Sequence, residues 1–310
     1  MISKDSKIYV AGHTGLLGST LEKVLKREGF ENLILRTHGE LDLRDLQATN
    51  GFFREEKPDY VFMAAAKVGG LKANVESPVD FLRDNLDIQT NVISSAHKVG
   101  VLKLLFFGSN CMYPKECKQP MNEEDILTGR FEPTNQAYAI AKIAGMEMCR
   151  AYNSQYETRF ITAIPASLYG PGDNFDMVNS HIVPTLIRRC HDAKIEGDVA
   201  VFLDGGKDRR RELVFVDDIA EASLFLMNNY ESSEPLNIGT NKDHSIEEIA
   251  HAIKRIVGFE GDILFNESKP TGMKRKLMDS QKIQDLGWKH QIEFEEGLME
   301  SYQWFLDKVA

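Results

Sequence analysis

A tyrosine and a lysine spaced four residues apart, Tyr138 and Lys142, have the types and spacing to perform proton chemistry. They fall in a predicted helix from Gln136 to Tyr156, in which residues four apart share one face. A neighbouring ammonium stabilises a phenolate, so the tyrosine could exchange a proton with a hydroxyl or ketone near neutral pH. Tyr138 alone among the nine tyrosines has a lysine at this spacing. Ser109, at the carboxyl end of the predicted strand Leu104 to Phe107, could hold the same substrate oxygen.

Three glycines with the spacing G-x-x-G-x-x-G follow the first predicted strand, Lys7 to Val10, and precede a helical pattern. Glycine lets the backbone approach a pyrophosphate closely, and the helix N-terminus supplies free N–H groups. The spacing is one residue longer than the common dinucleotide fingerprint. We therefore predict that this loop binds a dinucleotide through Gly12, His13, Thr14, Gly15, Leu16, Leu17 and Gly18.

The end of the second predicted strand, Leu33 to Leu35, distinguishes between the two nicotinamide cofactors. A carboxylate at this position binds the ribose 2′-hydroxyl of NAD, whereas an arginine accommodates the 2′-phosphate of NADP. Here Arg36 and His38 follow the strand, and no acid occurs before Glu40. The segment therefore favours NADP(H), with Arg36 and His38 as its contacts.

The elements that must position these groups alternate between short apolar runs and longer helical patterns. Continuous apolar strands indicate burial on both faces, which is typical of a parallel sheet covered by helices. With right-handed crossovers, the pattern predicts an α/β fold, a Rossmann-type doubly wound parallel sheet. Its strands are expected at 7–10, 33–35, 60–64, 104–107 and 160–164, and its long helices at 78–98 and 136–156.

After residue 167 the alternation changes, but no stretch rich in Pro, Gly or Ser separates the two halves. We therefore expect a smaller α/β substrate-binding domain that is interleaved with the first. The predicted cofactor domain covers 1–167 and about 213–243, and the predicted substrate domain covers 168–212 and 244–310. Further helices are expected near 181–193, 245–257 and 293–309, and further strands at 199–203, 213–216 and 236–239.

The composition excludes several classes of protein. The chain has 310 residues, 42% of them hydrophobic, and a formal net charge of −10, so nucleic-acid binding is not expected. It has no run of 18 apolar residues and no apolar leader at its N-terminus, so no membrane partner is expected. Four cysteines without a C-x-x-C pair indicate reduced thiols and a cytoplasmic protein, and no metal site is predicted.

Beyond these features, the chain resembles the extended short-chain dehydrogenase/reductases that act on nucleotide sugars and, among them, the GDP-L-fucose synthase family. The resemblance covers essentially the whole chain. It rests on the segments Ala64–Gly70, Gly108–Pro114, Glu132–Lys142, Leu168–Asn174, Asn179–His181, Arg211–Glu212, Val216–Asp218 and Tyr302–Phe305.

That resemblance implies an activity and a set of site residues. The family converts GDP-4-keto-6-deoxy-D-mannose to GDP-L-fucose by epimerising carbons 3 and 5 and then reducing the keto group with NADPH. Ser109, Tyr138 and Lys142 would form the reductase triad, and Cys111 and His181 the acid/base pair for epimerisation. The remaining residues expected at the cofactor are Phe107, Gly108, Asn110, Pro165, Ala166, Ser167 and Leu168, together with Ser109, Lys142 and His181. A homodimer built from the helices near 78–99 and 136–156 is also implied.

The GDP-sugar would bind in the second half of the chain. The resemblance places Arg189, Arg211 and Lys276 near the GDP moiety, Phe202 near the guanine, and Thr271 in the same segment as Lys276. Arginine suits two-pronged contacts with phosphate. The chain departs from the family pattern at Thr14, Asn110, Ala166, Ser167 and Thr271, mostly on the substrate side, which leaves the exact sugar open.

Alternative functions remain at this point. The same fold could serve a reductase, with or without epimerase activity, for a related GDP-4-keto-6-deoxy sugar such as a heptose. A nucleotide-sugar dehydratase or 4-epimerase is disfavoured, because those enzymes keep NAD bound and the second strand here lacks an acid. A non-catalytic NADP-binding regulator would not require Ser109, Tyr138 and Lys142 together.

Overall fold

The computed structural model describes residues 1–176, 180–266, 268 and 272–310. Its centre is a six-stranded parallel sheet in the order β2-β1-β3-β4-β5-β9. Almost every residue in β1, β3, β4, β5 and β9 is buried, which explains their continuous apolar sequences. The strands are β1 (Ile8–Ala11), β2 (Leu33–Ile34), β3 (Tyr60–Met63), β4 (Lys103–Phe107), β5 (Phe160–Pro165) and β9 (Leu236–Ile238).

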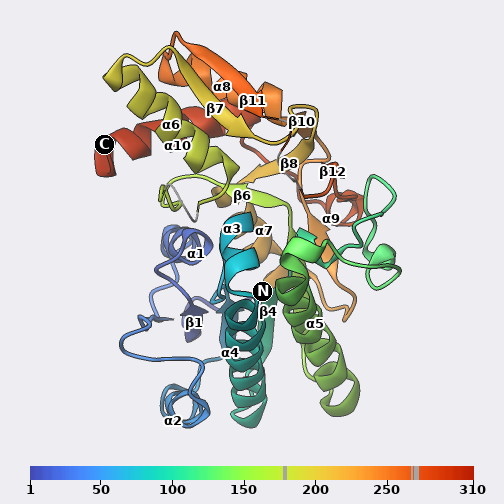
Figure 1. Ribbon diagram of the computed structural model, residues 1–310. Coiled ribbons are helices and arrows are strands. Elements are labelled where there is room, and N and C mark those ends of the chain that lie inside the picture. Colours follow the sequence, from blue (N-terminus) through green and yellow to red (C-terminus); the bar gives the residue numbers. More distant parts are fainter. Residues whose placement is uncertain (177–179, 267, 269–271) are drawn as a thin grey trace.

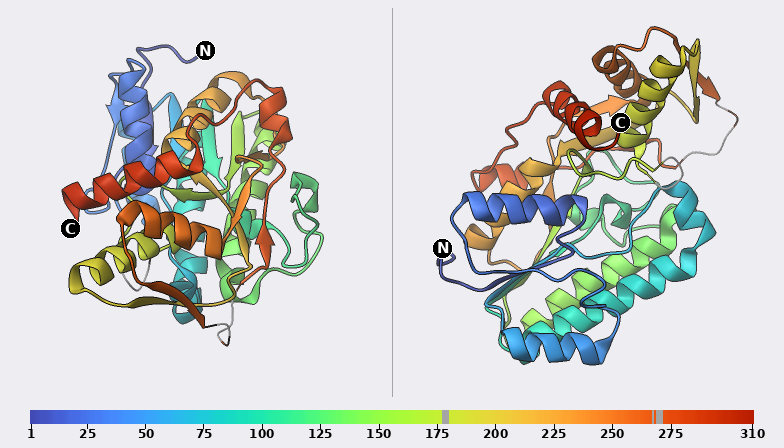
Figure 2. Two further views of the ribbon diagram at one scale, coloured as in Figure 1. Left: turned by 90° about the horizontal axis from the view of Figure 1, so that it is seen from above. Right: turned by 90° about the vertical axis from the view of Figure 1, so that its left-hand side faces the viewer.

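Helices cover both faces of this sheet (Figure 1; Figure 2, right). On one face α1 (Leu16–Arg27) packs against α7 (Val216–Asn229), and on the other α4 (Pro78–Lys98) packs against α5 (Gln136–Tyr156) and α2 (Leu46–Glu56). The predicted doubly wound Rossmann-type fold is confirmed. Within the described residues, no helix is both long and apolar enough to cross a bilayer.

A second group of elements lies beyond the carboxyl ends of the sheet strands, at the top of Figure 1. The strands β6 (Ser167–Tyr169), β10 (Asp243–Ser245) and β12 (Arg275–Lys276) all pair with β8 (Arg210–Phe215). The strands β7 (Ala200–Asp204) and β11 (Asp262–Asn266) form a separate parallel pair. The helices here are α6 (Ile182–Glu196), α8 (Ile246–Val257) and α10 (Phe294–Lys308). The short helix α9 (Gln281–Asp285) packs against β9 of the large sheet, and α3 (Leu71–Glu76) precedes α4.

Buried apolar side chains form two clusters, one around the six-stranded sheet and one among α6, α8, α10, β7 and β8. The chain passes between these regions several times, since α7 and β9 return to the large sheet. The division of the chain at 167/168, 212/213 and 243/244 stays a prediction.

The strand order determines where a ligand can bind. The order reverses between β1 and β3, and open α/β sheets bind ligands in the crevice beyond the carboxyl ends of the strands at such a switch point. The glycine loop leaves β1 at this edge, and a short 3₁₀ turn, η1 (Asn110–Met112), follows β4. The strand β6 follows β5 after one residue. Both predicted groups of cofactor contacts therefore lie at the same edge of the sheet.

Candidate active site

The glycine loop is shaped by close backbone contacts. Gly12 has φ +82°, and a Cβ there would lie 2.7 Å from the Cα of Ala65, just after β3. A Cβ on Gly18 would lie 2.1 Å from the carbonyl oxygen of Gly12. By contrast, Gly15 precedes α1 as its N-cap and is exposed, and the nearest atom to a Cβ there would be 3.6 Å away. Gly12 and Gly18 are thus required by the close backbone packing of the fold, whereas Gly15 leaves the N-terminus of α1 accessible to a ligand.

This difference between the glycines predicts two distinct mutant phenotypes. Gly18→Ala should lower the free energy of unfolding by about 2 kcal/mol or more, because its methyl group overlaps rigid backbone. Gly15→Ala should leave the melting temperature nearly unchanged but weaken NADPH binding at least tenfold, because its methyl group would separate the pyrophosphate from the helix N-terminus. Thermal unfolding and fluorescence titration with NADPH measure the two effects. Unchanged NADPH affinity in a folded Gly15→Ala variant would contradict this assignment.

The residues after β2 show why no acid is free to bind a ribose hydroxyl. The guanidinium of Arg36 pairs with Glu56 and lies 5.7 Å from the centre of the Phe52 ring. The carboxylate of Glu40 accepts hydrogen bonds from both the N–H and the hydroxyl of Thr37, which lower its pKa. Both contacts lie within the turn that contains Glu40, so this carboxylate is not free to bind a ribose hydroxyl.

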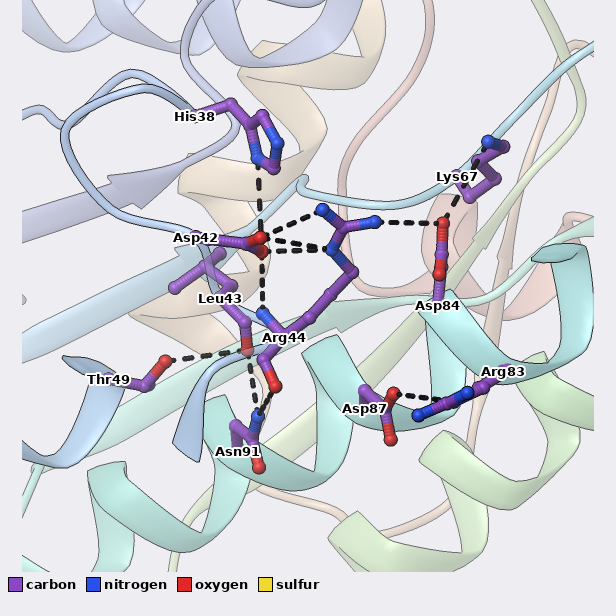
Figure 3. A network of polar contacts seen from close by, with 10 residues as sticks. All are labelled: His38, Asp42, Leu43, Arg44, Thr49, Lys67, Arg83, Asp84, Asp87 and Asn91. Carbon is purple, nitrogen blue, oxygen red and sulfur yellow. Dashed lines mark hydrogen bonds and ion pairs between the residues drawn. The ribbon is translucent and has the colours of Figure 1, made fainter. Parts of the chain in front are cut away.

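The next acid, Asp42, belongs to an ion-pair network that fixes this segment onto α4 (Figure 3). Arg44 donates to Asp42 at 2.8 Å and to Asp84 of α4 at 3.4 Å. These contacts with Arg44 lower the pKa of Asp42 to about 2. His38 lies 3.9 Å from the same carboxylate. The amide of Asn91 also donates to two main-chain carbonyls of the segment. The sequence analysis did not single out Arg44.

The structure brings the predicted reductase residues together at the start of α5. Ser109 follows β4 after one residue, Gly108, and its side chain hydrogen-bonds with Tyr138. The Tyr138 ring meets the edge of Phe81 from α4, with ring centres 6.2 Å apart. Lys142 is buried, and its ammonium donates to the carbonyl of Phe107 at 2.8 Å. These contacts fix the serine and tyrosine hydroxyls side by side at the carboxyl end of β4.

The pKa of Tyr138 differs from the one expected from the sequence. Burial is the main cause that raises the pKa of Tyr138, charge on Cys111 adds to it, and the hydrogen bond with Ser109 opposes it. The expected lowering by Lys142 is wrong for this structure, because the ammonium contacts the carbonyl of Phe107 and stands 5.9 Å from the phenol ring centre. Burial lowers the pKa of Lys142 to about 8. Tyr138 is therefore a protonated phenol at neutral pH, the form that can donate a proton.

The thiol of Cys111 lies in the 3₁₀ turn that Ser109 caps, and it faces two hydrogen-bond donors. The Asn135 amide stands 3.0 Å and the Lys276 ammonium 3.4 Å from its sulfur. The N–H of Cys111 donates to the Ser109 hydroxyl at 3.2 Å. His181 is the N-cap of α6, and burial, followed by the charge of Lys276, lowers its pKa. The residue is nevertheless exposed at the surface, so a ligand can reach it.

The predicted GDP-binding residues form two groups. Arg211 and Lys276 are register partners on β8 and β12 beside Cys111. Burial, followed by the nearby charge of Arg209, lowers the pKa of Arg211 to about 10. Arg189 of α6 donates to the carbonyl of Phe202 at 2.8 Å, and Phe202 is 67% exposed, as a base-stacking platform requires. Thr271 and Asn179 lie outside the described residues.

Two of the departures from the family pattern are in contact with each other. The side-chain amide of Asn110 donates to the Ser167 hydroxyl at 3.2 Å, so η1 is joined to β6. The carbonyl oxygen of the same amide accepts from Lys276 at 3.2 Å. Asn110 therefore connects the predicted cofactor contacts with the predicted substrate contacts.

Sequence reasoning missed the roles of Asn135 and Glu212. Glu212 is buried in β8 and accepts main-chain N–H groups from Thr240, Asn241 and Met278 at 2.7–2.8 Å. These contacts tie β8 to the segment that follows Lys276. Burial raises the pKa of Glu212 to about 7. Both residues lie in segments on which the family resemblance rests, Glu132–Lys142 and Arg211–Glu212, but nothing in the local pattern indicates the contacts that they make.

Comparisons with known proteins match this architecture. A family model for the NAD dependent epimerase/dehydratase family matches residues 8–239. The chain belongs to this family. Within the family, it is 49% identical to "Putative GDP-L-fucose synthase 2" of Arabidopsis thaliana, over 100% of this chain and 94% of that protein. This relative confirms the resemblance to GDP-L-fucose synthases.

Two solved structures of the family are also similar. One is a GDP-6-OMe-4-keto-L-xylo-heptose reductase from C. jejuni, with a TM-score of 0.96 and 39% identity, covering 99% of each chain. The other is a GDP-L-fucose synthetase from Naegleria fowleri bound to NADP, with a TM-score of 0.92 and 30% identity, covering 99% of this chain and 96% of that one.

Proposed function

We propose that this protein converts GDP-4-keto-6-deoxy-D-mannose to GDP-L-fucose, by epimerisation at carbons 3 and 5 and NADPH-dependent reduction at carbon 4. One observation carries the proposal. The single turn after β4 holds both Ser109, hydrogen-bonded with the phenol of Tyr138, and Cys111, whose sulfur faces Asn135 and Lys276. One bound sugar can therefore meet a reductase acid and an epimerase base. The GDP-L-fucose synthase relatives support the same substrate.

The residues present fit NADPH. Thr14 and Gly15 are exposed at the N-terminus of α1, where free N–H groups favour a pyrophosphate. The Nδ1 of His13 is buried and has no hydrogen-bond partner among the described residues. When bound, NADPH supplies the hydride for reduction. The residues after β4 and β5 would hold its nicotinamide end, because they follow the strands at the same edge as the glycine loop.

In the reduction, Tyr138 donates its proton to the oxygen at carbon 4. Ser109 holds that oxygen through its hydroxyl, and the ammonium of Lys142, 5.9 Å from the centre of the Tyr138 ring, adds positive charge to the site. The buried setting that keeps the phenol protonated also strengthens these electrostatic contacts.

In the epimerisation, the 4-keto group acidifies the protons at carbons 3 and 5. Cys111 removes such a proton from one face of the sugar, and the electron pair moves onto the keto oxygen as an enolate. Imidazolium at His181 returns a proton to the carbon from the other face. The lowered pKa of His181 makes its imidazolium a stronger acid, which suits this step.

The cation that follows β2, Arg36, predicts which nicotinamide cofactor the protein prefers. Arg36→Asp should lower the NADPH:NADH ratio of kcat/KM at least tenfold, because the variant removes the cation expected to face the 2′-phosphate. Arg54→Asp on α2 is the matched control, since its Nε only donates to a main-chain carbonyl of its own helix, that of Asn50. Steady-state kinetics with both cofactors measure the ratio. An unchanged ratio for Arg36→Asp would show that another residue recognises the phosphate.

The pKa of Lys142 predicts a pH dependence. With its pKa near 8, Lys142 is charged below that pH and loses its proton as the pH rises through it. The single-turnover rate of reduction should therefore fall as the pH rises above about 8. Lys142→Arg keeps the charge at all these pH values and should remove this fall, even if its rate is lower. A rate that stays flat from pH 7 to 10 in the unmodified protein would contradict the assignment.

The similarity to the C. jejuni GDP-6-OMe-4-keto-L-xylo-heptose reductase favours one alternative, a reductase for a related GDP-4-keto sugar such as a heptose. NADPH oxidation, followed at the nicotinamide absorbance band, separates these functions when a deoxyhexose and a deoxyheptose substrate are compared. We expect kcat/KM to be at least tenfold higher for GDP-4-keto-6-deoxy-D-mannose. The opposite order would establish the alternative, and NADPH binding without turnover of any keto sugar would indicate a regulator.

We further propose a cytoplasmic homodimer with the two predicted domains. Four free cysteines fit a reducing compartment. Exposed apolar side chains on α4 and α5, Val79 and Ile140, support a dimer through these helices. Light scattering after gel filtration measures the mass of the assembly, and a monomer at micromolar concentration would contradict the dimer.

A further inference from the structure

Lys276 forms no ion pair with an acidic side chain among the described residues, and two other contacts fix the position of its ammonium. It stands 3.4 Å from the sulfur of Cys111 and 3.2 Å from the side-chain oxygen of Asn110. The Asn135 amide approaches the same sulfur at 3.0 Å. Two donors, one of them positively charged, therefore converge on one thiol. Donors stabilise negative charge on an acceptor, and a nearby cation favours a thiolate.

The backbone around Lys276 is fixed from several directions. β12 pairs with β8, so that Lys276 is in register with Arg211. The N–H of Leu277 donates to Gln119 at 2.9 Å, and that of Met278 donates to the buried carboxylate of Glu212 at 2.8 Å. These contacts fix the point on the backbone from which the lysine side chain reaches the sulfur.

We propose that Lys276 is a positioning residue that holds Cys111 as the thiolate for proton abstraction at carbons 3 and 5. The proposal rests on the proposed function, because it concerns the base of that reaction. In the step itself the thiolate takes the carbon-bound proton, an S–H bond forms, and the C–H electron pair becomes the enolate. Lys276 transfers no atom. Its charge stabilises the thiolate before the step.

Other charged or titratable groups also face Cys111. Arg211 of β8 adds a second positive charge and favours the thiolate. Burial is the main reason that the phenol of Tyr138 on α5 stays protonated, and negative charge on Cys111 favours the protonated phenol further. His181 at the start of α6 senses the charge of Lys276, which disfavours its own protonation. The charge of Lys276 thus favours the deprotonated form of both members of the pair.

The alkylation rate of Cys111 by iodoacetamide tests this inference in the free protein. Thiolates react and thiols do not, so the midpoint of the pH profile reports ionisation. With peptide mass mapping to separate the four cysteines, Lys276→Met should move the Cys111 midpoint up by about one pH unit, a tenfold loss of rate at pH 7. Lys276→Arg should restore most of the rate. Lys274→Met removes a charge from the same segment and should change nothing.

Turnover gives the second readout. For Lys276→Met in deuterated water, deuterium incorporation per NADPH oxidised should fall at least fivefold, because the variant slows proton abstraction more than it slows keto reduction. If Lys276 only bound the diphosphate, KM would rise and this ratio would stay constant. An unshifted Cys111 midpoint in folded Lys276→Met protein, or a constant ratio, would overturn the inference. The alkylation needs no substrate, so it decides the role of Lys276 even if the proposed sugar is wrong.

Discussion

Tyr138→Phe should reduce the rate of keto reduction at least about a hundredfold while leaving the NADPH affinity within about twofold. The variant keeps the ring that packs against Phe81 and removes only the hydroxyl that hydrogen-bonds with Ser109. Because the phenol is protonated at neutral pH, its loss removes the proton that the alkoxide needs. Stopped-flow measurement of NADPH oxidation and a separate NADPH titration give the two values.

Tyr152→Phe is the matched control for this prediction. Tyr152 lies on the same helix but near its carboxyl end, where it contacts His97 and Tyr156. Its variant should reduce the keto group at the normal rate. If Tyr138→Phe kept more than a tenth of the normal rate, another group would have to be the acid, and the reductase assignment would be wrong.

Cys111→Ser should separate the two reactions of the proposed site. A serine hydroxyl is hardly ionised at neutral pH, so the base would be lost even though hydrogen bonds from Asn135 and Lys276 could still form. We expect deuterium incorporation at carbons 3 and 5 to fall at least about a hundredfold. NADPH oxidation should continue and give an unepimerised, GDP-rhamnose-type product. Mass and NMR analysis of the product formed in deuterated water measures both effects.

Two further variants sharpen this test. Cys117→Ser changes the other partly exposed cysteine and should leave incorporation unchanged. His181→Asn should also impair epimerisation, because it removes the acid on the opposite face. Normal incorporation and a normal fucose product from Cys111→Ser would show that the thiol only packs, and would favour the reductase-only alternative.

The long elements of the fold could be predicted because their periodicity is strong. The helix α5 was expected at 136–156 and is found at Gln136–Tyr156, and α4 was expected at 78–98 and is found at Pro78–Lys98. The sequence analysis missed α2 (Leu46–Glu56), in which only Thr49, Phe52 and Phe53 are buried. It also missed β11 (Asp262–Asn266), which has no fully buried residue. Elements with little burial have little hydrophobic pattern to recognise.

The same physical limit applies to the site. The glycine loop and the Tyr138–Lys142 pair are local patterns, and the structure places them at one sheet edge. The contact of Lys276 with Cys111 joins residues 165 positions apart and depends on the pairing of β12 with β8, which local spacing does not encode. The pKa of Tyr138 was expected to fall and rises instead, because burial outweighs a lysine that hydrogen-bonds elsewhere.

The stereochemistry of the product tests most directly the claim that one site both epimerises and reduces. The protein is incubated with NADPH and GDP-4-keto-6-deoxy-D-mannose in deuterated water, and the sugar is examined by NMR. We predict GDP-L-fucose with deuterium at carbons 3 and 5 and one NADPH oxidised for each sugar formed. A product that keeps the D-manno configuration and has no deuterium at these carbons would contradict the claim.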